Sequence, residues 1–261
     1  MNSIDEVAFA SPMRHMAPLG KLLLCLFLLI ASLASATIIV PLLVLGIGLG
    51  LILYGTKGKV PRVVGIALLD SLLVLLVSAL LIALMTGGTV VAVYDLFGLK
   101  VTFTQEGVAI ATGLIAKVLA GMTVMLAFAL TTPIPHLAIA LRQVRVPREV
   151  CEVMVLIYRY SFLLLEQLEA MRLAAEVRLG FRGARRRLRT SGKMAVGVFT
   201  RSLEMAERSE VALRSRAFKG DFRTFREPGK MGAIWYVLPA ALFLALYALN
   251  LFLVHIIKVV M

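Results

Sequence analysis

Two arginines stand in the same local setting, each near the end of an amphipathic segment. Arg178 lies in the sequence Ala-Ala-Glu-Val-Arg-Leu-Gly-Phe, and Arg216 lies in Ala-Leu-Arg-Ser-Arg-Ala-Phe. A cation at a helix C-terminus is favoured by the helix dipole by ~0.3–1 kcal/mol, which is a purely structural reason for such an arginine. A guanidinium group also makes directional bonds to carboxylates and backbone carbonyls. Because the pattern occurs twice, it favours two anchors for a partner protein.

Asp70 and Lys117 are the clearest ionisable residues inside apolar runs. At ~1.5 Å per helical residue both lie near the middle of a membrane, so they could pair between two helices. We expect a buried structural ion pair, with a role in translocation or in partner contact as the alternative. The histidines His15, His136 and His255 are scattered near the ends of the runs. We therefore expect neither a metal site nor a cofactor.

The composition places these residues in a membrane protein that has one strongly basic segment. Of the 261 residues 60% are hydrophobic, and the mean hydropathy is +0.93. A soluble domain of this length needs far less apolar surface. The formal net charge is +13, and residues 142–230 hold 20 of the 28 basic side chains but 10 of the 15 acidic ones. Most of the excess positive charge thus lies in about a third of the chain.

Five apolar runs predict five transmembrane helices, at residues 20–37, 38–54, 63–85, 107–130 and 232–254. A span needs ~20 apolar residues, so a tight turn around residues 35–41 should divide the first long stretch into a hairpin. The first four spans form a predicted N-terminal membrane domain at 1–133. The fifth lies in a C-terminal part at 231–261.

Residues 134–230 are predicted to form a cytoplasmic module of amphipathic helices, which the family resemblance described below makes coupling helices. A short helix at 134–146 is bounded by prolines and should lie at the membrane interface. Long helices are expected at 148–178 and 193–216, separated by a turn at 190–192. Their apolar stripes should pack against each other. The stripes are Val150, Val153, Ile157, Ser161, Leu164, Leu168, Met171 and Ala175 in the first helix, and Val196, Phe199, Leu203 and Ala206 in the second.

The positive charges also predict an orientation. Lys57, Lys59 and Arg62 form a short basic loop, and the basic segment at 142–230 falls on the same side if there are five spans. The positive-inside rule places both in the cytoplasm, together with the N-terminus. We therefore predict an all-α, multi-pass protein of the inner (cytoplasmic) membrane, with the loop at 86–106 outside.

Three stretches of the chain carry a family resemblance. They are residues 11–21 before the first span, a central region, and the two arginine segments. The central region contains Thr-Thr-Pro at 131–133, Leu-Arg-Gln-Val-Arg-Val-Pro at 141–147 and Tyr-Arg-Tyr at 158–160. In these features the chain resembles the T component of an energy-coupling factor (ECF) transporter, most closely the CbiQ type of cobalt uptake systems.

The resemblance implies a coupling subunit that works with an ABC-type ATPase dimer. In that family, paired Ala-Arg-Gly-like signatures dock onto the ATPases, and here only Arg178 and Arg216 match the strict form. Their neighbours, which the resemblance places in the same docking sites, are Val177, Leu179, Ser215 and Ala217. A separate CbiM-like membrane protein, the S component, would bind the substrate. Cobalt is the substrate implied, with nickel or a vitamin as alternatives.

Other functions fit the sequence less well. The chain has no Walker A motif, so we expect it not to hydrolyse ATP. An autonomous secondary transporter should show an internal repeat and several intramembrane charges. A lipid-modifying enzyme should show clustered Asp, His or Ser at the edge of a span. Nucleic-acid binding is disfavoured because spans flank the basic segment. The arginine run at 185–189 could bind anionic lipid headgroups, at ~1 kcal/mol per residue, or a partner protein.

Overall fold

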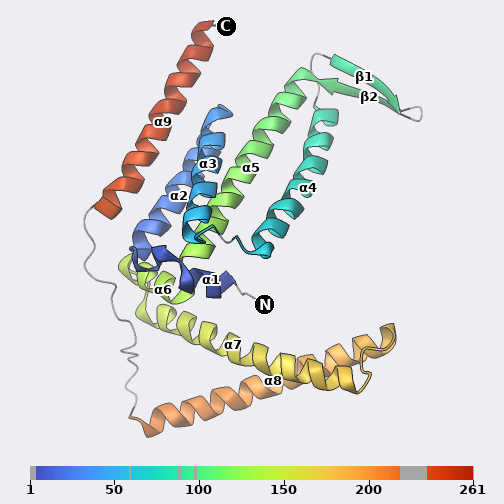
Figure 1. Ribbon diagram of the computed structural model, residues 1–261, viewed down its shortest axis with the longest axis vertical. Coiled ribbons are helices and arrows are strands. Elements are labelled where there is room, and N and C mark those ends of the chain that lie inside the picture. The colour runs from blue at the N-terminus through green and yellow to red at the C-terminus, as the bar shows by residue number, and fades with distance from the viewer. Residues whose placement is uncertain (1–3, 59, 87–89, 97–98, 218–233, 261) are drawn as a thin grey trace. The chain divides into compact units, whose positions relative to one another are not determined.

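The computed structural model describes residues 4–58, 60–86, 90–96, 99–217 and 234–260 (Figure 1). The chain divides into two compact units, one formed by Met1–Ala140 with Pro228–Met261 and the other by Leu141–Glu227. The sequence placed the corresponding boundaries at 133/134 and 230/231. The second of these boundaries lies outside the described residues.

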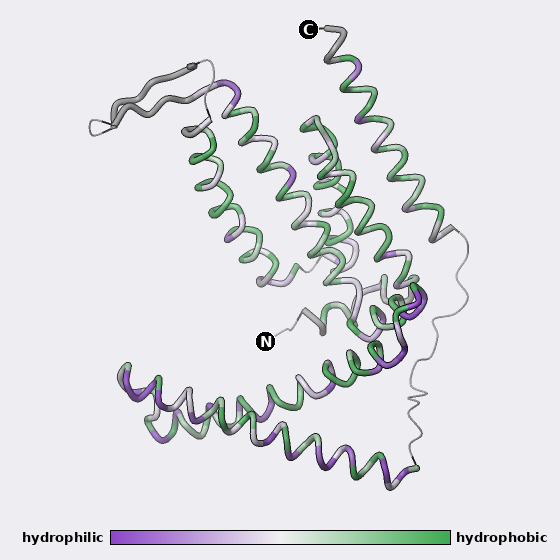
Figure 2. The backbone as a smooth tube through the Cα atoms, turned by 180° about the vertical axis from the view of Figure 1, so that it is seen from behind, coloured by the Kyte–Doolittle hydropathy of each residue, from purple (hydrophilic) through white to green (hydrophobic). Residues whose placement is uncertain are grey.

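The first unit contains the five apolar helices and several short elements. The apolar helices are α2 (Pro18–Ala34), α3 (Ile39–Gly55), α4 (Arg62–Met85), α5 (Gln105–Thr131) and α9 (Ile234–Val260). The short elements are α1 (Ile4–Ala10), η1 (Pro12–His15), β1 (Val90–Leu96), β2 (Leu99–Thr104) and α6 (Ile134–Gln143), which ends just beyond the unit boundary. Figure 2 shows that the five apolar helices are mostly hydrophobic along their length.

The predicted class, an all-α membrane protein, is confirmed. The stretches Val64–Ala83, Gln105–Thr131 and Val237–Ile256 are long and apolar enough to cross a membrane. The helices α2 and α3 have 17 residues each, a little under the ~20 that a straight span uses. The predicted start of the last span at Gly232 lies outside the described residues.

Small residues allow α3 and α4 to pack closely against α5. A methyl group added at Gly48 of α3 would lie 2.7 Å from the hydroxyl oxygen of Thr123, and one at Gly55 would lie 2.6 Å from a methyl carbon of Thr131. On the other side of α5, the buried residues Ala79 and Ala83 of α4 pack around Ala111. Close approach at small residues is how membrane helices gain packing energy, because lipid supplies no hydrophobic force between them.

The α2–α3 turn forms the predicted hairpin and is held by a buried amide of α9. Within the turn, the Ser35 hydroxyl donates to the carbonyl of Thr37 at 2.7 Å. The side-chain oxygen of Asn250 accepts from the backbone N–H of Ala36 at 3.3 Å and from the Thr37 hydroxyl at 3.4 Å. Asn250 is only 8% exposed. Polar contacts of this kind tie α9 to the first two spans.

The predicted outer loop at 86–106 contains a β hairpin. Strands β1 and β2 are antiparallel, with Asp95 opposite Lys100 and Leu96 opposite Leu99. Both strands are rich in Val, Thr and aromatic residues, which favour extended structure. The hairpin ends where Thr104 caps α5: its hydroxyl accepts from the N–H of Gly107 at 3.3 Å and donates to the carbonyl of Thr86 at 2.8 Å.

The second unit is an antiparallel helical hairpin of α7 (Arg148–Val177) and α8 (Ala184–Ser215). Contacts run in opposite order along the two helices. The Tyr160 hydroxyl lies 2.6 Å from that of Ser209, and Gly197 of α8 faces the sulfur of Met171. Near the turn, the Thr190 hydroxyl donates to the carbonyl of Gly180 at 2.8 Å. Purple, hydrophilic residues recur along both helices in Figure 2.

Two predictions for this hairpin are wrong. The turn between the helices lies at 178–183, not at 190–192, because the arginine run has good helix propensity and Gly183 provides the positive φ of 84°. The predicted stripe of α8 is not buried against α7: Val196, Phe199 and Leu203 are 50–66% exposed, and of these three only Phe199 lines the groove with Leu164 and Leu168. The face toward α7 is rotated, since Gly197 admits the Met171 side chain there.

Only part of the predicted apolar stripe of α7 faces α8. Leu164 and Leu168 line a groove with Met194 and Val198 of α8. Val150, Val153 and Ile157, in the first three turns, are 52–61% exposed. The predicted mutual apolar face therefore exists only over the second half of α7.

Candidate functional site

Arg178 is the C-cap of α7, and the chain turns sharply after it. Leu179 has φ +55°, and its N–H donates to the carbonyl of Glu176 at 2.9 Å. The N–H of Gly180 donates to the carbonyl of Ala175 at 2.8 Å. These two bonds and the left-handed residue between them define a Schellman motif. The motif satisfies the last carbonyls of α7 and fixes the direction in which Arg178 leaves the helix.

Arg216 is the C-cap of α8 and, like Arg178, is followed by a residue in the left-handed region. Ala217 has φ +51°, and its N–H donates to the carbonyl of Arg214 at 3.1 Å. The N–H of Arg216 itself donates to the carbonyl of Leu213 at 3.2 Å. Both predicted arginine motifs are thus the same local structure, an arginine followed by a residue in the left-handed region.

In both segments the residue after the arginine is not the glycine of the family signature, although its backbone is in the left-handed region. A glycine directly after the arginine would occupy this position without strain, but the chain has Leu179 and Ala217 there. A side chain in the left-handed region costs roughly 1–2 kcal/mol. Gly180 follows one place later, at a position where the Schellman motif needs only an N–H donor.

Both arginine side chains are exposed and available. Neither the Arg178 nor the Arg216 guanidinium forms a hydrogen bond or ion pair with any residue that the structure describes. Arginines two to six residues earlier differ, since Arg172 pairs with Glu176 at 3.1 Å and Arg214 with Glu210 at 2.5 Å. The remaining members of the two predicted sites are also exposed, namely Val177, Leu179, Ser215 and Ala217.

The two candidate sites lie at opposite ends of the hairpin. Arg178 stands at the turn between the helices, and Arg216 stands at the far end of α8 (Figure 1). The 32 residues of α8 span ~48 Å at 1.5 Å per residue. One small groove cannot hold both side chains, so the geometry presents two separate exposed arginines on one hairpin.

The electrostatic surroundings of the two anchors differ. Residues 178–189 contain six arginines and no acid, whereas residues 205–216 contain three arginines and two glutamates. The first turn of α8, which carries Arg185, Arg186 and Arg187, has no acidic residue. Cations at a helix N-terminus oppose the helix dipole. The turn end of the hairpin therefore carries an unbalanced positive charge.

The structure does not form the predicted Asp70–Lys117 pair. The Lys117 amine donates to the carbonyl of Leu33 in α2 at 3.3 Å. Asp70 is exposed on α4 and makes no ion pair with any described residue. The reason is rotational: α5 presents small residues such as Ala111 to α4, which places Lys117 on the side that faces α2.

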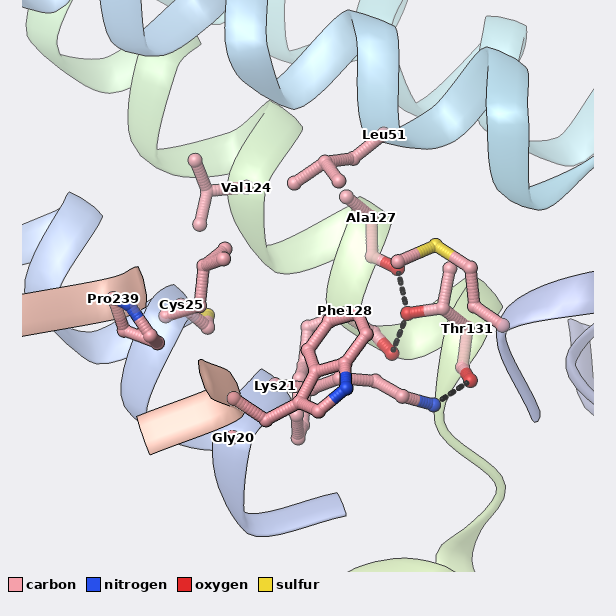
Figure 3. Close-up of a pocket in the computed structure, with 12 residues that line it drawn as sticks. Gly20, Lys21, Cys25, Leu51, Val124, Ala127, Phe128, Thr131 and Pro239 are labelled. Atoms are coloured by element: carbon pink, nitrogen blue, oxygen red, sulfur yellow. Dashed lines mark hydrogen bonds between the residues drawn. The ribbon is translucent and has the colours of Figure 1, made fainter. Parts of the chain in front are cut away.

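Lys21 is a buried cation that sequence reasoning did not single out. It is 7% exposed, and its amine donates to the carbonyl of Thr131, the last residue of α5, at 2.9 Å (Figure 3). Cys25, Val124 and Phe128 line the same pocket. A cation at a helix C-terminus is favoured by the dipole and by the unpaired carbonyls there. The only signal in the sequence was a lysine at the start of an apolar run.

The described part of the chain contains no group of three or more His, Cys, Asp or Glu residues that could hold a metal ion. The side chain of His15 lies outside that part. His136 is in α6 and His255 is exposed in α9, so these two lie in separate elements of the first unit.

The fold and the paired anchors define a class: a multi-span α-helical membrane protein with an added hairpin of long polar helices. A family model described as CbiQ, cobalt transport protein, matches residues 9–226, which include both anchors. The chain belongs to this family of cobalt transport proteins.

Individual relatives agree with the family. The chain is 32% identical over 250 residues to uncharacterized protein MJ1089 of Methanocaldococcus jannaschii, covering 93% of this chain and 90% of that one. It is 30% identical over 228 residues to a protein of Methanocorpusculum labreanum named as a fused cobalt transport protein CbiMQ, covering 87% of this chain but 38% of that one. It is 33% identical over 147 residues to the cobalt transport protein CbiQ of Rhodobacter capsulatus, covering 56% of this chain and 60% of that one.

Proposed function

We propose that this protein is the transmembrane coupling subunit, or T component, of an ECF-type ABC importer for cobalt. It is not itself an enzyme in this proposal; two ABC-type ATPase subunits supply the energy. One observation carries the proposal. Two exposed arginines, Arg178 and Arg216, have no partner among the described residues, and each is a C-cap followed by a left-handed residue at opposite ends of one hairpin. Each would insert into a groove on one ATPase of a dimer.

The hairpin is suited to act as a lever between the ATPases and the membrane. Its helices have 30 and 32 residues, and they are joined side by side by packing and by hydrogen bonds such as Tyr160–Ser209. A force applied at one end therefore moves the whole element. The Schellman motif at Arg178 and the backbone bonds of Arg216 and Ala217 make these two helix ends stiff. When ATP binding closes the ATPase dimer, the two anchors would be displaced and the hairpin would pass that motion to the spans.

The substrate and the second membrane partner come from the family and its names. The family is one of cobalt transport proteins, and one relative bears the fused name CbiMQ. A fusion keeps two components in one chain, which supports association with a CbiM-like membrane subunit. In this proposal that subunit binds the cobalt ion and this chain couples its movement to ATP.

The charge distribution supports a location in the cytoplasmic membrane with the hairpin in the cytoplasm. The α3–α4 connection carries Lys57, α4 begins at Arg62, and the hairpin carries most of the excess positive charge. With five spans both fall on one side, and the positive-inside rule makes it the cytoplasmic side. The ATPases would meet the hairpin there.

The test reverses both anchor charges. The complex of this chain with its ATPases and the CbiM-like subunit is reconstituted in liposomes, and ATP-driven uptake of radioactive cobalt is measured. Arg178→Glu with Arg216→Glu should abolish uptake and release the ATPases, while the chain stays monodisperse in detergent. Arg208→Glu serves as the matched control, because Arg208 is 83% exposed on α8 and lies eight residues before the anchor. Uptake that survives the double reversal would contradict the docking role.

A further inference from the structure

One acid lies on the outer surface of a membrane helix. Asp70 is exposed, and it follows Arg62, the first residue of α4, by eight positions. That distance is ~12 Å along the helix axis. The apolar part of a bilayer is ~30 Å thick, so Asp70 lies close to its middle. The aspartate side chain is too short to reach either interface from there.

The surface around Asp70 is apolar and follows the helix period. Ile66, Leu73, Val77 and Leu81 recur with Asp70 at steps of three and four and are 53–66% exposed. The opposite surface of α4 is buried, as shown by Val64 at 1%, Leu75 at 7%, Ala79 at 6% and Ala83 at 5% exposure. Since Ala79 and Ala83 pack against α5, Asp70 points directly away from α5.

Lipid cannot serve as the neighbour of this side chain. Ionisable residues within spans almost always face protein or water and pair with another group. Asp70 forms no hydrogen bond or ion pair within the described residues. The basic side chains inside α2 and α5 are already engaged, because Lys21 donates to Thr131 and Lys117 to Leu33. A second copy of this chain therefore offers no free cation from these two helices.

We propose that the surface formed by Ile66, Asp70, Leu73 and Val77, called here the Asp70 face, binds a transmembrane helix of the CbiM-like subunit. That helix carries a lysine or arginine at the depth of Asp70. A carboxylate only accepts hydrogen bonds, and a cationic donor both satisfies it and neutralises its charge in the low dielectric of the membrane. The flanking residues supply apolar packing. This inference rests on the proposed function, from which it takes the identity of the partner.

The first experiment removes the charge while keeping the shape. This chain is co-expressed with the ATPases and the CbiM-like subunit and purified through a tag on this chain. Asp70→Asn should lower the co-purified CbiM-like subunit by about tenfold or more, as expected when one member of a buried charge pair is lost. Asp70→Glu should retain it. Ser78→Ala is the control, because the Ser78 hydroxyl donates to the Val74 carbonyl of its own helix at 2.9 Å.

The second experiment locates the partner. Leu73→Cys, at a position that is 60% exposed, is alkylated with a maleimide that carries a photoreactive benzophenone, and on illumination it should cross-link to the CbiM-like subunit in membranes. A cysteine at Leu244 of α9, which is 63% exposed, should not. Retention of the ATPases by each variant shows that the chain is folded.

The outcomes separate this inference from the proposed function. If Asp70→Asn retains the CbiM-like subunit at the wild-type level, or if the cysteine at Leu73 links two copies of this chain, the Asp70 face is not the binding surface. The proposed function is untouched in both cases. If the wild-type chain retains no CbiM-like subunit at all, the proposed function fails and the inference fails with it.

Discussion

The two ends of the α7–α8 hairpin share a C-cap arginine followed by a left-handed residue, but the charge of the neighbouring residues differs. Arg178 and Arg216 are both C-caps followed by a left-handed residue. Residues 178–189 contain six arginines and no acid, whereas residues 205–216 contain three arginines and two glutamates. A shared backbone geometry explains how each end could fit the same kind of groove. The charge difference implies that the two ends can differ in affinity and in association rate, even toward identical ATPase subunits.

The largest expected effect tests whether the ends are equivalent. Arg216→Glu alone should weaken ATPase binding by at least ~30-fold, the loss typical of an interface hot spot of ~2 kcal/mol. Arg178→Glu alone should weaken it less, because five arginines remain nearby to attract an acidic surface. Binding of each variant to the purified ATPase dimer is measured by surface plasmon resonance. Equal losses at both ends would show that the charge difference has no role in docking.

The second largest expected effect is on the rate of ATPase association and on its dependence on salt concentration. Replacing Arg185, Arg186, Arg187 and Arg189 by glutamine should slow ATPase association by roughly tenfold at low salt, since steering by charge acts mainly on the association rate. The wild-type rate should fall as salt is raised, and the variant's rate should fall much less. Arg201→Gln with Arg208→Gln, on the other half of α8, is the control. If the variant keeps the full salt dependence, the arginine run meets something other than an acidic ATPase surface, and anionic headgroups become the leading candidate.

A smaller effect should appear in stability and be alike at both ends. Leu179→Gly or Ala217→Gly removes the side chain from the left-handed region and should stabilise the hairpin by about 0.5–1 kcal/mol. Leu188→Gly, in the interior of α8, should destabilise it by about 1 kcal/mol, because glycine is a poor helix former. Thermal unfolding of the full chain in detergent, followed by circular dichroism, measures these shifts. A destabilising effect of glycine at either left-handed position would contradict the cap geometry.

The smallest expected effect comes from the ion pairs beside the anchors. Glu176→Gln and Glu210→Gln break the exposed pairs with Arg172 and Arg214. Each should change stability by less than about 0.5 kcal/mol, as for other exposed pairs along a helix. The same thermal unfolding measures this change. A larger loss at one end only would mean that the paired glutamate orients the neighbouring anchor.

Sequence reasoning was most successful for features that a short stretch of the chain specifies, such as the start of a helix or the turn between two apolar runs. The predicted turn between the first two spans lies where the Asn250 contacts hold it, and the predicted helix starting at 148 begins at that residue. It was least successful where two helices must meet. Asp70 and Lys117 have suitable depth and charge, yet they face different neighbours, because depth along a helix says nothing about rotation around it. The same reason explains why the face of α8 toward α7 is rotated from the predicted stripe.

The sequence by itself determined the membrane class, the number and order of the apolar helices, and the positions of Arg178 and Arg216. These follow from run length, from local charge and from helix propensity, which are properties of neighbouring residues. Only the tertiary structure decided that the two arginines share one cap geometry and stand at opposite ends of a hairpin. It also decided that the Lys21 amine donates to the carbonyl of the last residue of α5, while Asp70 has no partner among the described residues. These facts depend on how helices rotate and pack, which small residues such as Gly48 and Gly197 control at a distance in sequence.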